Sequence, residues 1–492
     1  MARGFKADRR DFLNKEQCRL LHENSCRLLA ETGIELEQGR AVDIFTGAGA
    51  SYEQGRVKIP ARLVEDTLTR INKNFSLKGA VPENNLNISA ENPVSYFGTG
   101  GQALNVLDYK DGSFCKREAV GSDLVNIIKI CEELDNVDYI TRPVEPDVAR
   151  ERIDIEKTKI FQANTRKHIN LANLVVKEKL PEILKLVKDK ELISFISCVP
   201  VSPLKLEKNT AEKFIDIVNN DIAVAISSCP QAGMTAPLSE PGELLQVNTE
   251  LLAAIILANL IKPGARVMYR GIPITSNLHL DNSPRWSQPD SIKRVAAITS
   301  MTYFYGVPCC GTCAVADEKE PNAQNISEKI LSWTMELASG AQYINSALGM
   351  MEQVMTVSPE QYIIDDMLIT MLKEAFTAAA GLENRDLRQI VTATAAKGFS
   401  ALGAVCNDEI TAEINKRLDF IFTEREAYNR ESLEKQLLLI QKAVLSGKSS
   451  AVFMRKSRAG LRKGFLYAGN RISGKLDLQN IIKKKDNILN KG

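Results

Sequence analysis

Residues Ser95–Gly101 read SYFGTGG, a short apolar segment that ends in a glycine-rich turn. The same arrangement returns later in the chain at Val199–Leu204 (VPVSPL), Cys229–Pro237 (CPQAGMTAP) and Gly349–Thr356 (GMMEQVMT). Each cluster of small residues follows an apolar segment and precedes a stretch of helical character. This pattern is typical of a (β/α)8 barrel, in which the loops after the strands carry the chemistry.

Eight apolar segments have the length and composition of buried strands, and a helical segment follows each of them. They are residues 94–97, 137–141, 167–171, 193–199, 223–228, 266–269, 308–311 and 343–348. Alternating strands and helices favour a parallel sheet, and eight repeats favour its closure into a barrel. On this pattern alone an open doubly wound sheet stays an alternative, although the chain has no GxGxxG or P-loop motif for a nucleotide.

We therefore expect an α/β fold, a (β/α)8 TIM barrel over residues 91–383, with a hairpin insert near residues 105–112. Residues 1–90 have helical spacing and predict an N-terminal cap. Residues 384–453 predict C-terminal helices. Residues 454–492 carry eleven Lys or Arg against two acids. For this basic tail, a partly disordered segment and a docking segment for an acidic protein are both open.

The overall composition excludes several classes of protein. With 44% hydrophobic and 25% charged residues, the chain can form a sizeable core. A net charge of +2 gives no general attraction to nucleic acid or membranes. No run reaches the ~20 apolar residues of a membrane span, and the polar N-terminus does not resemble a secretion signal. We expect a cytoplasmic protein.

Cysteine and histidine offer little for catalysis. Cys131, Cys198 and Cys229 lie in apolar segments and are expected to be buried thiols. The cluster Cys309, Cys310 and Cys313 fits a zinc corner, a redox pair or a buried strand, and no second CxxC completes a metal site. We expect no metal. A mechanism that needs paired histidines has few candidates, because the chain contains three.

Aromatic and acidic residues near the strand ends are the candidate site. Aromatic rings attract cations, particularly quaternary ammonium groups that donate no hydrogen bond. Glu352, just after the eighth strand, is the catalytic candidate. For Trp286, in SPRWSQPD, the alternative is a structural anchor of its loop. The substrate-binding candidates are Tyr96, Phe97, Trp286 and Tyr343.

The order of the motifs resembles the trimethylamine:corrinoid methyltransferase family over roughly residues 13–385. FGTGG after the first strand is followed by PVSPL, by PQAGMTAP before a helix with Gln246, Asn248 and Glu250, and by PGA at 263–265. Asp317–Gln324 and GMME complete the series. A departure is Cys406–Ile410, which has no histidine where family members often carry one.

The resemblance implies a TIM-barrel enzyme that moves a methyl group from a methylated amine to the cobalt(I) of a separate corrinoid protein. The chain has only standard amino acids and resembles the branch without pyrrolysine, whose characterised members demethylate quaternary amines such as glycine betaine. The pyrrolysine position falls near residues 349–354. The loops expected to face the corrin ring contain Gly98, Gly100, Gly101, Gly233, Thr235 and Gly349.

The resemblance further implies that no cofactor is tightly bound and that the corrinoid comes with a partner protein. We also expect a homo-oligomer. Two alternatives stay open at this point. One is a zinc-dependent methyltransferase that uses the cysteine cluster, and the other is a barrel that binds betaine without turnover.

Overall fold

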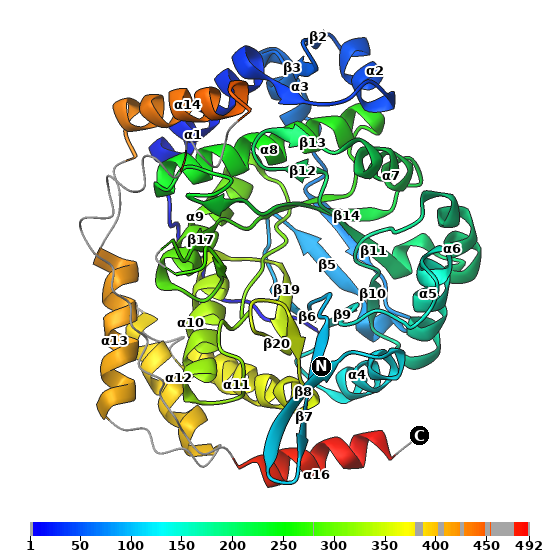
Figure 1. Cartoon of the computed structure of the whole chain (residues 1–492), viewed down its shortest axis with the longest axis vertical. Helices are drawn as coiled ribbons and strands as arrows, with labels where there is room; N and C mark the ends of the chain where they lie inside the picture. The colour runs from blue at the N-terminus through cyan, green and yellow to red at the C-terminus, as the bar shows by residue number, and fades with distance from the viewer. Residues whose placement is uncertain are drawn as a thin grey trace.

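A strongly curled parallel sheet forms the centre of the protein (Figure 1). The structure is a computed structural model and describes residues 3–278, 280–378, 387–401, 408–423, 428–447, 453 and 477–490. The strand order is β16-β14-β11-β10-β9-β6-β19, and all pairs are parallel. The strands are β6 (Tyr96–Thr99), β9 (Tyr139–Thr141), β10 (His168–Asn170), β11 (Ile193–Ser197), β14 (Ala223–Ser228), β16 (Val267–Gly271) and β19 (Tyr343–Leu348). Seven of the eight predicted strands are confirmed.

The eighth predicted strand lies between the two edges of this sheet. On one side, the N–H of Tyr269 in β16 donates to the carbonyl of Pro308 at 2.8 Å. On the other side, the N–H of Asn345 in β19 donates to the carbonyl of Gly311 at 3.0 Å. Residues 308–311 thus connect the edge strands by hydrogen bonds, which is consistent with a TIM-barrel-like fold.

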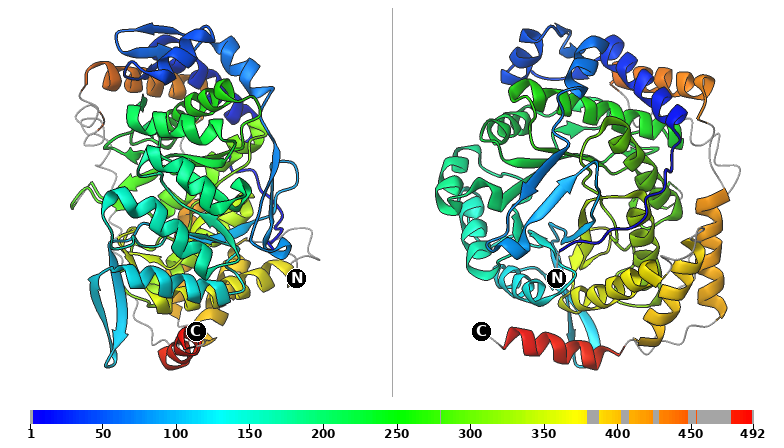
Figure 2. Two further views of the ribbon diagram at one scale, coloured as in Figure 1. Left: turned by 90° about the vertical axis from the view of Figure 1, so that its right-hand side faces the viewer. Right: turned by 180° about the vertical axis from the view of Figure 1, so that it is seen from behind.

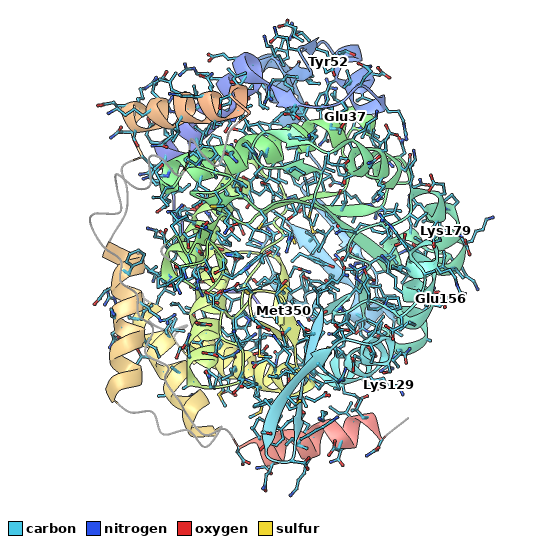
Figure 3. All side chains as sticks on the ribbon, in the orientation of Figure 1. Glu37, Tyr52, Lys129, Glu156, Lys179 and Met350 are labelled. Carbon is cyan, nitrogen blue, oxygen red and sulfur yellow. The ribbon has the colours of Figure 1, made fainter. Side chains whose placement is uncertain are left out.

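Helices surround the curled sheet on its outside (Figure 1). Charged side chains such as Glu156 and Lys179 lie on the outer surface of this layer (Figure 3). The helices are α4 (Gly121–Glu133), α5 (Ile153–Asn164), α6 (Leu180–Val187), α7 (Lys208–Asn219), α8 (Glu240–Ile261), α9 (Pro289–Tyr305), α10 (Ala323–Ser339) and α11 (Pro359–Ala378). Single-turn 3-10 helices lie at Pro82–Asn84, Arg150–Arg152, Lys177–Lys179 and Lys190–Leu192.

Helix α8 is apolar on nearly every side. It begins at Ser239, whose hydroxyl accepts from the N–H of Gly242 at 3.3 Å, and Glu240 and Glu243 favour its N-terminus. By length and composition alone this helix could cross a membrane, but 89% of its most apolar window is buried within the protein. Among the described residues it is the one helix that meets this criterion, and its burial is that of a core helix.

The N-terminal region contains strands that its sequence did not predict. Helices α1 (Lys15–Arg27), α2 (Arg40–Gly47) and α3 (Ala61–Leu68) are joined by a π-helical turn at Leu28–Thr32 and by a small mixed sheet. The sheet has the order β12-β13-β1-β3-β2. Its strands are β1 (Ile34–Glu35), β2 (Ser51–Glu53), β3 (Arg56–Lys58), β12 (Pro200–Val201) and β13 (Lys205–Leu206). The VPVSPL loop therefore leads directly into this sheet.

A second N-terminal hairpin closes one end of the barrel. Strands β4 (Asn74–Leu77) and β5 (Leu86–Ser89) pair antiparallel and cross behind the sheet (Figure 2, right). Leu77, Leu86 and Ile88 belong to the same buried cluster as the inward-facing residues at the start of the barrel strands, among them Tyr96, Tyr139, Met268 and Tyr343. Access to the interior is therefore left to the end at which the strands finish.

Short strands surround that open end. The predicted hairpin is confirmed as β7 (Asn105–Lys110) and β8 (Ser113–Glu118), which projects away from the barrel (Figure 2, left). It pairs with β20 (Met350–Met351) and β21 (Thr356–Val357) in the order β20-β21-β7-β8. A three-stranded sheet consists of β15 (Gln231–Ala232), β17 (Ile274–Ser276) and β18 (Pro284–Arg285).

The C-terminal part is helical where it is described. Its helices are α12 (Leu387–Ala401), α13 (Asp408–Thr423), α14 (Arg430–Leu445) and α16 (Leu478–Leu489). Within the predicted basic tail, α16 packs on α4 and α11, with Ile481 and Ile488 buried and Lys485 paired with Glu360. Residues 454–476, 491 and 492 of that tail lie outside the described residues, as do Cys406 and Asn407. The division into domains stays a prediction.

The closing hairpin should contribute strongly to stability. Leu86 is fully buried, so Leu86→Ala should lower the free energy of unfolding by about 2–4 kcal/mol. The neighbouring exposed Asn87→Ala should change it by less than about 0.5 kcal/mol. Denaturant unfolding followed by circular dichroism measures both. Equal effects of the two substitutions would contradict the assignment of this hairpin as the barrel's plug.

Candidate functional site

The interior of the barrel changes from aromatic to polar toward its open end. Near the closed end, the rings of Tyr139 and Tyr343 stack with centroids 3.7 Å apart. One layer further along, Arg270 donates to the Ser227 hydroxyl at 2.8 Å and to the side-chain amide oxygen of Asn345 at 3.3 Å. Successive inward positions of a strand are two residues apart, which places this polar layer directly above the aromatic one.

Two thiols lie at the edge of the interior. Cys198 and Cys229 directly follow β11 and β14, and both are exposed, which corrects the expectation that they are buried. They differ from the buried Cys131 because each stands one residue past its strand, at the open end. Burial against the surrounding chain nevertheless raises the pKa of Cys229 to about 12, although the charge of Arg270 lowers it in part. Cys229 is thus open to solvent although protein atoms surround it on most sides. We call this space at the open end, beside Cys198 and Cys229, the recess.

Helix α8 fixes the loops that border this recess. The carboxylate of Glu250 accepts from the hydroxyls of Ser202 at 2.8 Å and Ser228 at 2.5 Å, and from the N–H of Leu204 at 2.9 Å. Burial raises the pKa of Glu250, and these hydrogen bonds lower it in part. The neighbouring Gln246 donates to the carbonyl of Thr235 at 2.9 Å. Gln246 and Glu250 of the helix motif therefore hold VPVSPL and CPQAGMTAP in place.

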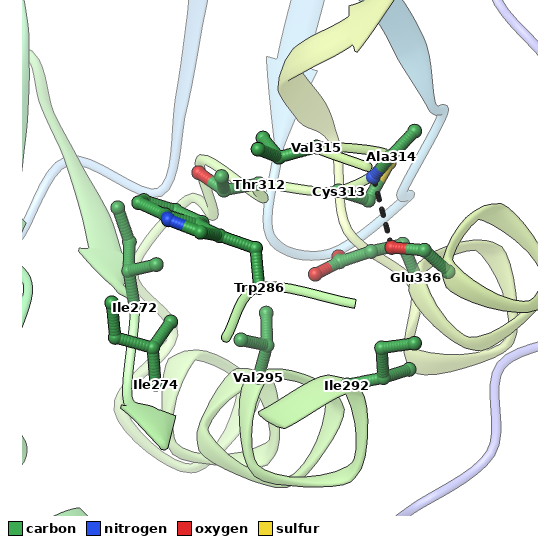
Figure 4. A pocket seen from close by; sticks show the side chains of 11 residues that line it. Ile272, Ile274, Trp286, Ile292, Val295, Thr312, Cys313, Ala314, Val315 and Glu336 are labelled. Atoms are coloured by element: carbon green, nitrogen blue, oxygen red, sulfur yellow. Dashed lines mark hydrogen bonds between the residues drawn. The ribbon is translucent and has the colours of Figure 1, made fainter. Parts of the chain in front are cut away.

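A pocket lies beside the recess, between the end of β16 and helices α9 and α10 (Figure 4). Its lining residues are Ile272, Ile274, Trp286, Ile292, Val295, Thr312, Cys313, Ala314, Val315, Ser332 and Glu336. The space between the closed side chains holds about one water molecule. Mostly apolar walls with a few polar groups are usual for ligand sites in proteins.

Three polar side chains of this pocket lack partners, whereas the Ser332 hydroxyl accepts from the N–H of Ala314 at 2.9 Å. The indole N–H of Trp286, the hydroxyl of Thr312 and both carboxylate oxygens of Glu336 are buried without a hydrogen bond of normal geometry in the described part of the chain. Burial raises the pKa of Glu336 to about 8, and the nearby backbone of Thr312 offsets this only in part. Unpartnered buried polar groups are costly, so a bound molecule is expected to satisfy them.

Of the predicted aromatic residues, only Trp286 lines this pocket. Its backbone N–H donates to the Asp317 carboxylate at 3.0 Å, which also gives it the structural role of a loop anchor. Tyr96 lies at the closed end, where its hydroxyl accepts from the N–H of Asn87 at 3.1 Å. Phe97 packs outward, with the Lys373 ammonium 5.0 Å from its ring centroid. Tyr343 lies in the aromatic layer below Arg270. Their role in substrate binding stays a prediction.

Glu352 lies at the rim of the open end. Its carboxylate accepts from Lys116 of the projecting hairpin at 3.0 Å and from the Thr356 hydroxyl at 2.6 Å. Burial alone would raise the pKa of Glu352, but these hydrogen bonds and the lysine charges outweigh it and hold the pKa below its usual value. The residue therefore carries a charge that is already paired, and its catalytic role stays a prediction.

The predicted small residues pack closely against their neighbours. A Cβ at Gly98, Gly100 or Gly101 would lie within 2.4 Å of a neighbouring residue. Gly233 and Gly349 adopt φ of +82° and +84°, where side chains are strained. The hydroxyl of Thr235 accepts from the N–H of Gln231 at 2.9 Å within the same loop. Substitution at these glycines would disturb the loops themselves, and their contact with a corrin ring stays a prediction.

The cysteine cluster does not converge on one point. Cys310 belongs to the interior cluster with Tyr139, while Cys309 and Cys313 pack in the outer core. Burial raises the pKa of all three thiols. Within the described ranges, the group with metal-binding geometry is instead His22, Cys26 and Glu65, between α1 and α3. His168 is buried, with its pKa lowered by burial to about 4, and His279 lies outside the described residues.

Stability should fall with rising pH because of Glu336. Its pKa rises from the usual 4.5 to about 8 on folding, so the folded state holds a proton that the unfolded state loses between these values. Glu336→Gln should therefore match the wild type near pH 4.5 and exceed its free energy of unfolding by a few kcal/mol at pH 8. Denaturant titrations at several pH values measure this difference.

Glu352, at the rim, provides a control because folding shifts its pKa in the opposite direction from that of Glu336. Because the pKa of Glu352 is lowered on folding, Glu352→Gln should cost stability near neutral pH and lose that effect as the pH falls. Parallel pH profiles for the two variants would contradict the assignment of a buried, unpaired carboxyl at Glu336.

Comparison with known proteins adds independent information. A family model described as trimethylamine methyltransferase (MTTB) matches residues 6–399. Trimethylamine methyltransferase MttB of Methanosarcina barkeri (strain Fusaro / DSM 804) is 30% identical over 376 residues, covering 73% of this chain and 75% of that protein. Glycine betaine methyltransferase of Desulfitobacterium hafniense (strain Y51) is 26% identical over 374 residues, covering 74% and 76%.

Proposed function

The chain belongs to the trimethylamine methyltransferase (MTTB) family, and we propose that it transfers a methyl group from a quaternary amine, such as a betaine, to the cobalt(I) of a separate corrinoid protein. Membership makes it an enzyme of methylated amine or betaine:corrinoid methyl transfer and implies a corrinoid protein as partner. The choice of a quaternary amine over a tertiary one is the proposal. The observation that carries the function is the family match over residues 6–399.

The chemistry suits a site without histidine. The corrinoid supplies a cobalt(I) nucleophile, which takes the methyl group while the nitrogen leaves as a neutral amine. The chain then has to desolvate the cation, hold its methyl group in line and exclude water. None of these tasks needs a proton to be moved, in agreement with two described histidines that both make structural contacts.

The open end of the barrel is the side from which a partner protein can approach the interior. The β4–β5 hairpin closes the end where the strands begin, and the recess with Cys198 and Cys229 opens at the other. We propose that the corrinoid protein approaches this open end and that the pocket with Trp286 receives the methylated nitrogen. Because the closed pocket has room for about one water molecule, the loop that carries Trp286 would have to move outward on binding. We also propose a cytoplasmic homo-oligomer.

A direct assay tests the activity. The purified protein is incubated with reduced corrinoid and a panel of methylated amines, and methyl-cobalt absorbance is followed. We expect it to rise with at least one quaternary amine, and to stay flat without protein or without amine. A flat trace with every amine, including in the presence of a corrinoid protein, would contradict the proposed function.

Substitution of Trp286 tests the cation site. Trp286→Ala should weaken binding of the quaternary amine by about 1–2 kcal/mol through loss of a desolvated cation–π contact. Trp286→Phe keeps an aromatic face and should retain most of the affinity. Calorimetric titration of both folded variants measures the difference. Unchanged affinity in Trp286→Ala would remove this residue from the site.

A further inference from the structure

Arg270 differs from the buried Arg142, Arg266 and Arg294 in its partners. It is 8% exposed, and its hydrogen bonds go to Ser227 and Asn345, both neutral. No carboxylate oxygen of the described residues lies within the 4.0 Å of an ion pair with its guanidinium. Three other buried arginines are paired: Arg142 with Glu145 at 2.5 Å, Arg266 with Glu191 at 3.0 Å and Arg294 with Glu243 at 2.6 Å.

The guanidinium is directed into the interior of the barrel. Met268, two residues earlier in β16, belongs to the interior cluster, so Arg270 shares its inward face. Ser227, which accepts from Arg270, stands two residues before the exposed Cys229 at the open end of β14. The guanidinium therefore lies one inward layer deeper in the barrel than the exposed Cys229.

This arrangement is costly unless the recess receives an anion. A buried charge with neutral partners has lost its hydration without gaining a counter-charge. Buried charged groups without a counter-charge are concentrated at functional sites. A guanidinium offers paired N–H donors that match the two oxygens of a carboxylate.

Resting on the proposed function, we propose that Arg270 binds the carboxylate of a zwitterionic quaternary amine and so selects betaines over amines without an acid group. The pocket of Trp286 and Glu336 adjoins this site. Ile272, two residues after Arg270, lines it, and so does Thr312, which bridges to Asn345. Arg270 would then hold the carboxylate of the zwitterion, and the neighbouring pocket of Trp286 and Glu336 would hold its quaternary nitrogen.

Paired ligands that differ only in the carboxylate test this inference. Glycine betaine is compared with choline, and γ-butyrobetaine with butyltrimethylammonium, by calorimetric titration of the full-length protein. The wild type should bind the carboxylated member of at least one pair about tenfold or more tightly. Arg270→Gln should abolish that preference and leave affinity for the partner without a carboxylate unchanged. Arg270→Lys should keep part of it, since one charge remains without the paired donors.

Two further variants guard against a trivial loss of folding. Arg266→Gln removes an equally buried arginine four residues away, whose partner is Glu191. It should lower stability but leave the ligand preference unchanged. Asn345→Asp keeps Arg270 and places a carboxylate where the amide oxygen now accepts. It should preserve the fold and abolish the preference, because the guanidinium is then already paired.

The outcomes separate this inference from the proposed function. Equal wild-type affinity within both pairs, absence of binding by both betaines, or an unchanged preference in Arg270→Gln or Asn345→Asp would overturn the role of Arg270. Methyl transfer from a betaine that continues in Arg270→Gln with unchanged KM would overturn it while the function stands. Betaine binding that depends on Arg270, without methyl transfer from any amine, would overturn the function while the anion site stands.

Discussion

The stacked rings of Tyr139 and Tyr343 fill the closed end of the curled sheet. They form the layer on which the polar residues next to the open recess lie. A curled sheet of this size encloses space that side chains must occupy. The Tyr343 hydroxyl accepts from Asn170 at 3.1 Å and lies 3.3 Å from the Ser194 hydroxyl, so its ring has one position. Opposite it, a Cβ at Gly98 would lie 2.1 Å from the Tyr139 ring. Gly98 of the FGTGG motif, which lies within β6 and not after it, is thus a packing requirement of this aromatic layer.

Local patterns predicted the framework because each strand is a short apolar run with its own flanking helix. The segments 193–199 and 223–228 agree closely with β11 and β14. The closing hairpin was not predicted, since β4 and β5 are four residues each, with Asn74 and Asn87 exposed, and they gain stability only from the barrel they cover. Helical spacing likewise gave no sign of strands at Ile34–Glu35, which pairs with β13 far along the chain, or at Arg56–Lys58, which pairs with β1 and β2.

The site was harder to predict because the facing of single residues depends on register. Tyr96 and Phe97 are adjacent in β6 and necessarily point to opposite sides, so the pair could not share one site. Arg270 lies one residue past the predicted strand at 266–269, and that small error in the boundary hid its inward position. Glu336 lies within a helix and belongs to no motif. Only the packing of α10 against residues 308–313 reveals that its carboxyl is unpartnered.

The contrast between Arg266 and Arg270 shows how one strand region serves two purposes. Arg266 is paired with Glu191 near the closed end, where charge pairing supports the fold. Arg270 faces a recess with neutral partners, where a counter-charge has to come from outside. Trimethylamine has no carboxylate, whereas glycine betaine has one. An apolar wall discriminates between substrates that differ by one methylene group by only about 1–3 kcal/mol of binding free energy. A site built around a buried polar group discriminates far more strongly against a ligand that leaves this group unpaired. Within a family whose relatives carry both substrate names, a single unpaired guanidinium is therefore a sufficient physical basis for choosing between them.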